Sequence, residues 1–142
     1  MKTAFSIHGE PQGKGRPRFS VINGHANART PDKTVIYENL VRMEYRRQCG
    51  DARFPDDAVL RMEILAVFAI PASASKAKKQ RMENGELRPT KKPDMDNIVK
   101  VIADSLNGIA YRDDAQIVDC GISKRYGDVP RVEVQITDGR NA

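Results

Sequence analysis

The stretch KKPDMDNIVKVIADSLNGIAYRDDAQ, residues 91–116, gathers many carboxylates in a chain whose net charge is +5. It contains, in order, Asp94, Asp96, Lys100, Asp104 and the doublet Asp113-Asp114. Two carboxylates about 4 Å apart repel by roughly 4 kcal/mol at an effective dielectric constant near 20. A lysine offsets part of that repulsion and a divalent cation offsets more. The cluster therefore indicates a site that holds a cation.

Residues 94–107 are predicted to form a helix that presents several of these charges on one face. At 100° per residue, Asp96 and Lys100 lie about 40° apart, and Asp104 lies about 80° from Asp96. Asp94 suits the N-cap, outside helical geometry, where its carboxylate can turn back toward that of Asp96. The opposite, apolar face of the helix is predicted to consist of Ile98, Val101, Ile102 and Leu106.

The donor types favour Mg²⁺, with Mn²⁺ as a substitute, because Mg²⁺ prefers oxygen ligands and commonly takes a few carboxylates. Zinc is disfavoured because the two histidines, His8 and His25, lie far from the acids in the sequence. Adjacent residues in an extended chain point in opposite directions, so only one of Asp113 and Asp114 is expected to join the site. Such a cation polarises a phosphoryl oxygen or activates water, which indicates phosphodiester hydrolysis.

A basic segment runs directly into the acidic cluster. Residues 76–92 carry seven Lys or Arg and two acids, whereas residues 93–142 carry six and nine. A polyanion held by the first segment and cut at the second would suit this order, although a solvated lysine-rich helix has the same composition. The side chains expected to contact DNA are Lys14, Arg16, Arg18, Lys76, Lys78, Lys79, Arg81, Lys91 and Lys92.

The elements that position the cluster are a mixture of strands and helices. Strands are expected over residues 2–8, 58–70, 115–123 and 131–137, and Asn23-Gly24 predicts a hairpin. Further helices are expected over 30–50, capped by Thr30, and from a cap at Ser73 to Gly85. The 58–70 strand is apolar on both faces toward its end, as a central strand is. The core stripe of the 30–50 helix would be Ile36, Leu40 and Met43.

This order of elements predicts one α+β domain over residues 1–142, with a mixed or antiparallel sheet, hairpins and about three helices. No apolar run approaches the roughly 18 residues of a membrane span, and the N-terminal apolar stretch is too short for a signal peptide. We therefore expect a cytoplasmic protein with no membrane partner and no organic cofactor.

The motif KPDMDNIVKVIADSLNG followed by DDAQI resembles the RusA family of Holliday junction resolvases. The shared pattern is D-x-D-N, a lysine four residues after the second Asp, an Asp four further on, and then D-D-x-Q after a spacer. The match is specific over residues 94–119 and loose outside them. The basic residues of the GKGRPRF stretch lie in a variable part of the family, so DNA contacts there are inferred from charge alone.

The resemblance implies a RusA-like fold and a homodimeric, Mg²⁺-dependent endonuclease that cuts four-way DNA junctions symmetrically in recombination and repair. Its catalytic acids fall on Asp94, Asp96 and Asp114, which would also bind the metal, and its catalytic lysine falls on Lys100. Lys100 would steady developing negative charge or orient the attacking water. One acidic cluster per chain supplies one site, so cutting two opposed strands requires two copies.

Two other interpretations remain open at this point. The same site could serve another structured substrate, such as a flap or a replication fork. Alternatively, the chain could bind junction DNA without cutting it, with its acids acting only as caps and ion pairs. Cleavage of a four-way junction with and without Mg²⁺, beside linear and flap controls, separates these possibilities.

Overall fold

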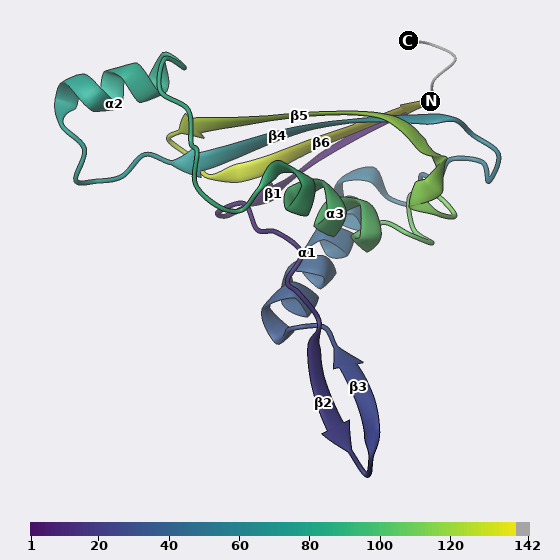
Figure 1. Ribbon diagram of the computed structural model, residues 1–142. Coiled ribbons are helices and arrows are strands. Elements are labelled where there is room, and N and C mark those ends of the chain that lie inside the picture. Colours follow the sequence, from purple (N-terminus) through teal and green to yellow (C-terminus); the bar gives the residue numbers. More distant parts are fainter. Residues whose placement is uncertain (139–142) are drawn as a thin grey trace.

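The computed structural model describes residues 1–138, except for the side chain of Arg18. Its fold is α+β, as predicted, with a four-stranded mixed sheet, a two-stranded hairpin and three α-helices (Figure 1). The elements in chain order are β1 (Lys2–His8), β2 (Arg18–Ile22), β3 (His25–Arg29), α1 (Asp32–Cys49), β4 (Leu60–Ala69), α2 (Lys76–Glu83), α3 (Met95–Ser105), the 3-10 turn η1 (Asp114–Gln116), β5 (Ile117–Gly127) and β6 (Arg131–Asp138).

The strands of the main sheet lie in the order β1-β6-β4-β5. β6 is antiparallel to both of its neighbours, whereas β5 runs parallel to β4. The prediction that the 58–70 strand is central is therefore confirmed. β5 and β6 are consecutive in sequence but are separated by β4. Because parallel strands need a crossover connection, the chain between β4 and β5 passes over the sheet, and α3 lies on that path.

Helices α1 and α3 cover one face of the main sheet (Figure 1). The apolar face predicted for α3 is confirmed, because all four of its residues are fully buried. The same core contains large side chains from α1, the strands and the loops, including Tyr45, Phe54, Phe68, Met62 and Tyr111. The charged face of α3 consequently turns away from the core.

The core face of α1 differs from the sequence prediction. Ile36 and Met43 are 68% and 57% exposed, whereas Tyr37, Val41 and Tyr45 are buried. Tyrosine rings are large apolar groups that fill a core, and a buried tyrosine hydroxyl usually finds a hydrogen-bond partner. Within residues 1–138 the buried Tyr37 hydroxyl has no such partner. The Tyr45 hydroxyl donates a hydrogen bond of 2.7 Å to the Ala52 carbonyl oxygen. The predicted stripe was therefore wrong at Ile36 and Met43, whereas Leu40 is partly buried and packs against the core as predicted.

Two predicted helix caps also shift along the chain. Helix α1 begins at Asp32, and its N-cap is Pro31 rather than Thr30. Helix α2 is capped by Ser75 rather than Ser73, and the Ser75 hydroxyl accepts a hydrogen bond of 3.2 Å from the Lys78 amide. Helix α2 lies beyond one end of the sheet (Figure 1). Across residues 1–138, no helix combines the length and the apolar character that crossing a bilayer requires.

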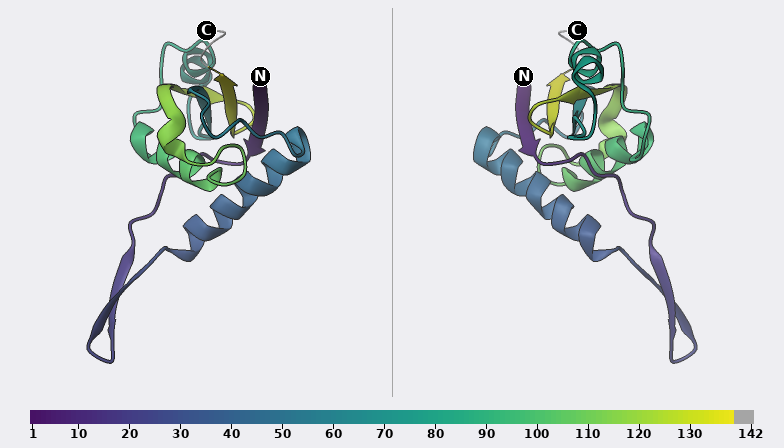
Figure 2. Two further views of the ribbon diagram at one scale, coloured as in Figure 1. Left: turned by 90° about the vertical axis from the view of Figure 1, so that its right-hand side faces the viewer. Right: turned by 90° about the vertical axis from the view of Figure 1, so that its left-hand side faces the viewer.

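The predicted hairpin is confirmed as β2 and β3, which project from the body as an arm (Figure 2). Its tip is the Asn23-Gly24 turn, where φ is 53° and 80°, as a tight hairpin turn requires. Phe19 pairs with Ala28 and Val21 pairs with Ala26, so one face of the arm is apolar. Both large side chains on that face are about three-quarters exposed, at 76% and 75%.

Candidate active site

The first acids of the motif lie where α3 begins. Asp94 is the N-cap, with extended backbone angles of φ −69° and ψ 155°, as predicted. Its side chain makes no capping hydrogen bond, so its oxygens are not used by the helix end. Asp96 lies in the first turn of α3 and is exposed. Negative charge at this position is favoured by the helix dipole.

Asp113 and Asp114 are adjacent in sequence but have different roles in the structure. The Asp113 carboxylate accepts a hydrogen bond of 3.1 Å from the Ala115 amide and caps η1. The Gln116 side-chain oxygen accepts one of 3.2 Å from the Asp113 amide, which closes a capping box. The Asp114 amide donates to the Asn107 side-chain oxygen at 2.7 Å. Asp113 is thus used in the turn, and Asp114 faces α3.

An open pocket of about 520 Å³ lies between α3 and the start of β5. Its charged lining comes from the motif, and its floor is apolar. The residues that line it are Met95, Asp96, Val99, Lys100, Ala103, Asp104, Asp114, Ile117, Cys120 and Ile122. Three of the four predicted catalytic residues, Asp96, Lys100 and Asp114, therefore share one pocket. Asp94 does not line it.

The carboxyl groups of Asp104 and Asp114 lie within hydrogen-bonding range of each other. The pKa of Asp114 is raised above its ordinary value, first by partial burial and then by the hydrogen bond and charge of Asp104, with a smaller contribution from Asp113. Lys100 opposes this shift. Two neighbouring carboxylates on packed elements are the local excess of negative charge that the sequence predicted, although the pair expected to converge was Asp94 and Asp96.

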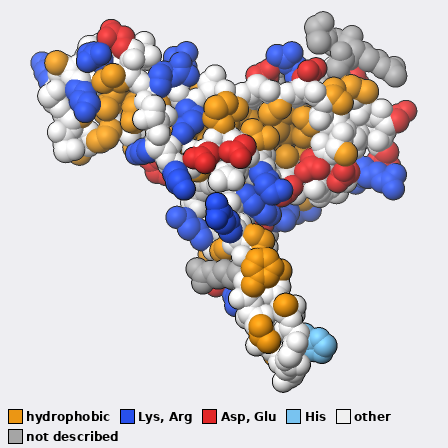
Figure 3. Space-filling view, viewed as in Figure 1, with side chains coloured by type: hydrophobic (Ala, Val, Ile, Leu, Met, Phe, Trp, Pro, Cys, Tyr) orange, Lys and Arg blue, Asp and Glu red, His pale blue; other side chains and the backbone are white. Residues whose placement is uncertain are grey.

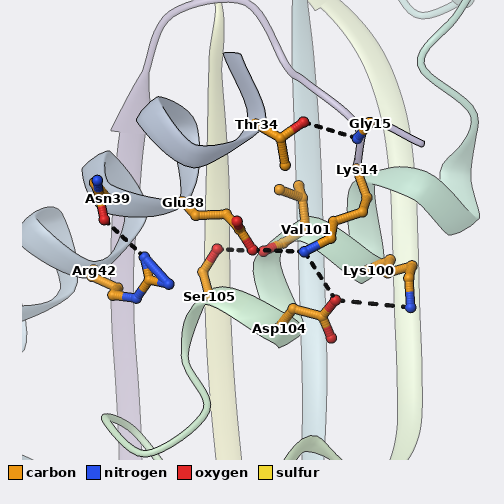
Figure 4. Close-up of polar contacts among 10 residues, drawn as sticks. All are labelled: Lys14, Gly15, Thr34, Glu38, Asn39, Arg42, Lys100, Val101, Asp104 and Ser105. Atoms are coloured by element: carbon orange, nitrogen blue, oxygen red, sulfur yellow. Dashed lines mark hydrogen bonds and ion pairs between the residues drawn. The ribbon is translucent and has the colours of Figure 1, made fainter. Parts of the chain in front are cut away.

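Two lysines face Asp104 from different parts of the chain (Figure 4). The Lys100 ammonium nitrogen lies 3.8 Å from the Asp104 Oδ2 atom, one helical turn away along α3. The Lys14 nitrogen lies 3.4 Å from the same oxygen and 2.9 Å from the Glu38 Oε2 atom on α1. Lys100 is 61% exposed, whereas Lys14 is 20% exposed. Lys100 is the lysine with room to meet a substrate.

The pocket suits a hard divalent cation in its donor chemistry. The contact between Asp104 and Asp114 supplies carboxylate oxygens, and Asp96 lines the same pocket. Carboxylates are the ligands that Mg²⁺ prefers. Within residues 1–138, however, no three acidic, histidine or cysteine side chains approach closely enough to form a ready ligand set. The predicted ligand set of Asp94, Asp96 and Asp114 stays a prediction.

The residues predicted to contact DNA are spread over several elements. Basic side chains gather on α2 and near the acids at the centre of the view in Figure 3. Lys76, Lys78 and Arg81 are exposed, and Lys79 is partly exposed. The exposed Lys91 and Lys92 stand just before α3. Arg16 is exposed, and the side chain of Arg18 lies outside the described part. Their role in binding stays a prediction.

Sequence reasoning missed two residues of this site. Asp104 was recognised as part of the motif, but its place between two lysines and Asp114 was not. Glu38, which binds Lys14, was not identified at all. It is buried at 8% exposure, which is unusual for a glutamate and is explained by its pairing with a lysine. Its spacing in α1 carries no sequence signal, because its partner lies 24 residues away.

Comparison with known proteins relates most of this chain, rather than the acidic motif alone, to one family. The chain is 38% identical over 134 residues to the uncharacterized protein YqaN of Bacillus subtilis (strain 168), and the match covers 94% of each chain. The model of the family described as endodeoxyribonuclease RusA matches residues 8–137, which include the arm, α1 and the whole pocket. The resemblance of the acidic motif therefore extends to nearly the full chain, which belongs to the RusA family of endodeoxyribonucleases, enzymes that hydrolyse DNA.

Proposed function

We propose that this chain is a Holliday junction resolvase that depends on Mg²⁺, or on Mn²⁺ in its place, and acts as a homodimer. One observation carries the proposal: a pocket lined by Asp96, Lys100, Asp104 and Asp114 in a chain of the RusA family. A helix that served only to cover the sheet would need neither the contacting carboxyls nor the exposed lysine. The non-catalytic interpretation fits this pocket less well.

Asp94, Asp96 and Asp114 would hold the metal, which when bound would polarise a phosphoryl oxygen and activate water. Lys100 extends from the same face of α3 with most of its side chain in solvent, where it can donate to a phosphate oxygen. A cation aimed at charge that develops in the transition state lowers the barrier. The buried Tyr111 hydroxyl donates to the carbonyl oxygen of Ala103, a residue that lines the pocket, at 2.7 Å.

Binding of the DNA backbone is assigned to the basic surface that leads into α3. Lys76, Lys78, Lys79 and Arg81 on α2 project beyond the sheet, and Lys91 and Lys92 continue toward Asp94. Phosphate contacts by lysine and arginine release counterions, which supplies affinity without sequence preference. This arrangement suits a substrate recognised by its shape.

A homodimer is supported by two exposed apolar surfaces. The apolar face of the arm, with Phe19 and Val21, is left exposed by the rest of residues 1–138, and Ile36 and Met43 are exposed on α1. An isolated two-stranded hairpin is marginally stable in water. Between residues 19 and 28 the arm carries no Lys or Arg, so a second copy of the chain fits this face better than DNA does.

The test is cutting of a labelled four-way junction with Mg²⁺, with Mn²⁺ and with neither, beside a linear duplex and a flap of matched sequence. We expect symmetric nicks in the junction only when a divalent cation is present. Equal cutting of the flap would replace junction resolution with a broader structure-selective activity. Tight junction binding without any cutting would support the non-catalytic interpretation instead.

A further inference from the structure

We propose that Lys14 is a positioning residue of the active site, which fixes the Asp104 carboxylate beside Asp114, and that it is not a phosphate contact. The inference rests on the nuclease activity proposed above and names a residue outside the acidic motif. Figure 4 shows Lys14 reaching between α1 and α3, with Glu38 on one side and Asp104 on the other.

The backbone of the loop that carries Lys14 is fixed at the starts of two helices. The Lys14 amide donates a hydrogen bond of 3.1 Å to the Asn97 carbonyl oxygen on α3. The Gly15 amide donates one of 3.0 Å to the Thr34 hydroxyl on α1. A Cβ atom on Gly13 would lie 2.9 Å from the Asn97 Cβ. The loop can approach α3 this closely only because that position is glycine.

The side chain of Lys14 is fixed as firmly as its backbone. Its nitrogen is 2.9 Å from Glu38 and 3.4 Å from Asp104, and only 20% of the side chain is exposed. Partial burial by itself lowers the pKa of Lys14, but the hydrogen bond and charge of Glu38, assisted by Asp104, outweigh burial and raise it. Lys14 therefore stays positively charged, and its ammonium group is engaged by Glu38 and Asp104 rather than left free in solvent.

Through Asp104, Lys14 can influence the predicted catalytic residue Asp114. Asp104 contacts Asp114, so a displaced Asp104 carboxylate would change both the position and the surroundings of Asp114. Lys100 cannot replace Lys14 in this role, because it is more distant from Asp104 at 3.8 Å and its side chain is mostly solvated. One lysine is thus available to the substrate, and the other orders the carboxylates.

The experiment must separate positioning from the simple neutralisation of Glu38. Lys14→Met alone leaves Glu38 buried and unpaired, which is expected to lower stability. The double variant Lys14→Met/Glu38→Gln removes the charge and its buried partner together. Each protein is measured for thermal unfolding, for metal-free junction binding across a salt series, and for single-turnover cutting with enzyme in excess. Lys33→Met, an exposed lysine near the start of α1, is the matched control.

If Lys14 positions Asp104, the double variant regains most of the thermal stability but still cuts about 10- to 100-fold more slowly, as loss of supporting contacts around catalytic groups does. Its junction affinity and salt slope stay at the wild-type values. The Lys33→Met control cuts at the wild-type rate.

Three results would overturn the proposal. Recovery of wild-type cutting in the double variant would limit Lys14 to neutralising Glu38. A weaker affinity with a flatter salt slope and an unchanged maximal rate would make Lys14 a phosphate contact. Absence of cutting by the wild-type chain on every DNA substrate would remove the proposed function and the role of Lys14 with it, whereas either of the first two results removes the role of Lys14 alone.

Discussion

The pocket at α3 and the basic helix α2 are close in sequence but are built in opposite ways. Helix α3 packs a fully buried apolar face on the sheet, and its charged groups contact one another across three chain segments. Helix α2 buries only Met82, and its cations project into solvent. Chemistry requires fixed distances between groups, whereas attraction of a polyanion acts over about a Debye length and tolerates motion. This difference supports the proposal that the pocket at α3 cuts DNA and that helix α2 binds it.

The largest expected effect comes from changing the three acids predicted to bind the metal. Asp94→Asn, Asp96→Asn and Asp114→Asn should each lower single-turnover cutting of a junction by about 10²–10³ or more, which corresponds to about 3–4 kcal/mol of lost transition-state stabilisation. Junction affinity should not fall, since each change removes negative charge. Cutting rates and metal-free binding are measured on the same junction. A variant that cuts at the wild-type rate excludes its residue from the site.

Lys100→Met should have the next largest effect on cutting. Loss of a cation aimed at developing charge is expected to slow the maximal rate by about 10²-fold while leaving the affinity nearly unchanged. Arg112→Met, an exposed cation outside the pocket, serves as the control. An unchanged rate at saturating enzyme would place Lys100 with the solvated surface charges of α2 rather than with the pocket.

Changing α2 should produce the opposite pattern. The triple variant Lys78→Ala/Lys79→Ala/Arg81→Ala should weaken binding to the junction and flatten its salt dependence, by about 0.9 in the slope of log K for each lost phosphate contact. Its cutting rate with enzyme in saturating excess should match the wild type. Fluorescence anisotropy over a salt series measures the slope. If the slope stays at the wild-type value, α2 is only a solvated surface.

The smallest expected effect comes from changing the arm, which belongs to neither the pocket nor α2. Phe19→Ser/Val21→Ser should weaken the dimer, because these side chains form its exposed apolar face. Light scattering should give about twice 15.9 kDa for the wild type and a lower average mass for the variant. Asn27→Ser changes the opposite face and is the control. An unaltered mass in the Phe19/Val21 variant would exclude the arm from the interface.

Local patterns predicted the local part of the site. The apolar positions of α3 and the four-residue spacing of Asp96, Lys100 and Asp104 are set within a few helical turns, so the apolar and charged faces of α3 could be predicted. The ion pair that Lys100 makes with Asp104 was not among the predictions. The Asn23-Gly24 turn is also determined locally, because both of its residues accept positive φ. In both cases the energy that decides the structure comes from near neighbours.

Non-local packing decided what the sequence did not show. The strand β4 separates β5 from β6, although the chain runs directly from one to the other. Helix α1 buries Tyr37 and Tyr45 instead of Ile36 and Met43, because tyrosine rings fill the core. The link from Lys14 to Glu38 and Asp104 depends on that orientation of α1 and on a loop held against α3. No spacing rule within one element contains this information.

The proposed resolvase activity requires that the pocket cuts DNA and that two copies of the chain cut one junction together. The most direct measurement is the digestion of a supercoiled plasmid that extrudes a single cruciform, with Mg²⁺ and enzyme in excess. If paired pockets act within one complex, linear plasmid appears as the first major product, and Asp114→Asn yields none. Accumulation of nicked circles with no linear product would exclude paired cutting, and equal cutting of a plasmid without a cruciform would exclude selectivity for the junction.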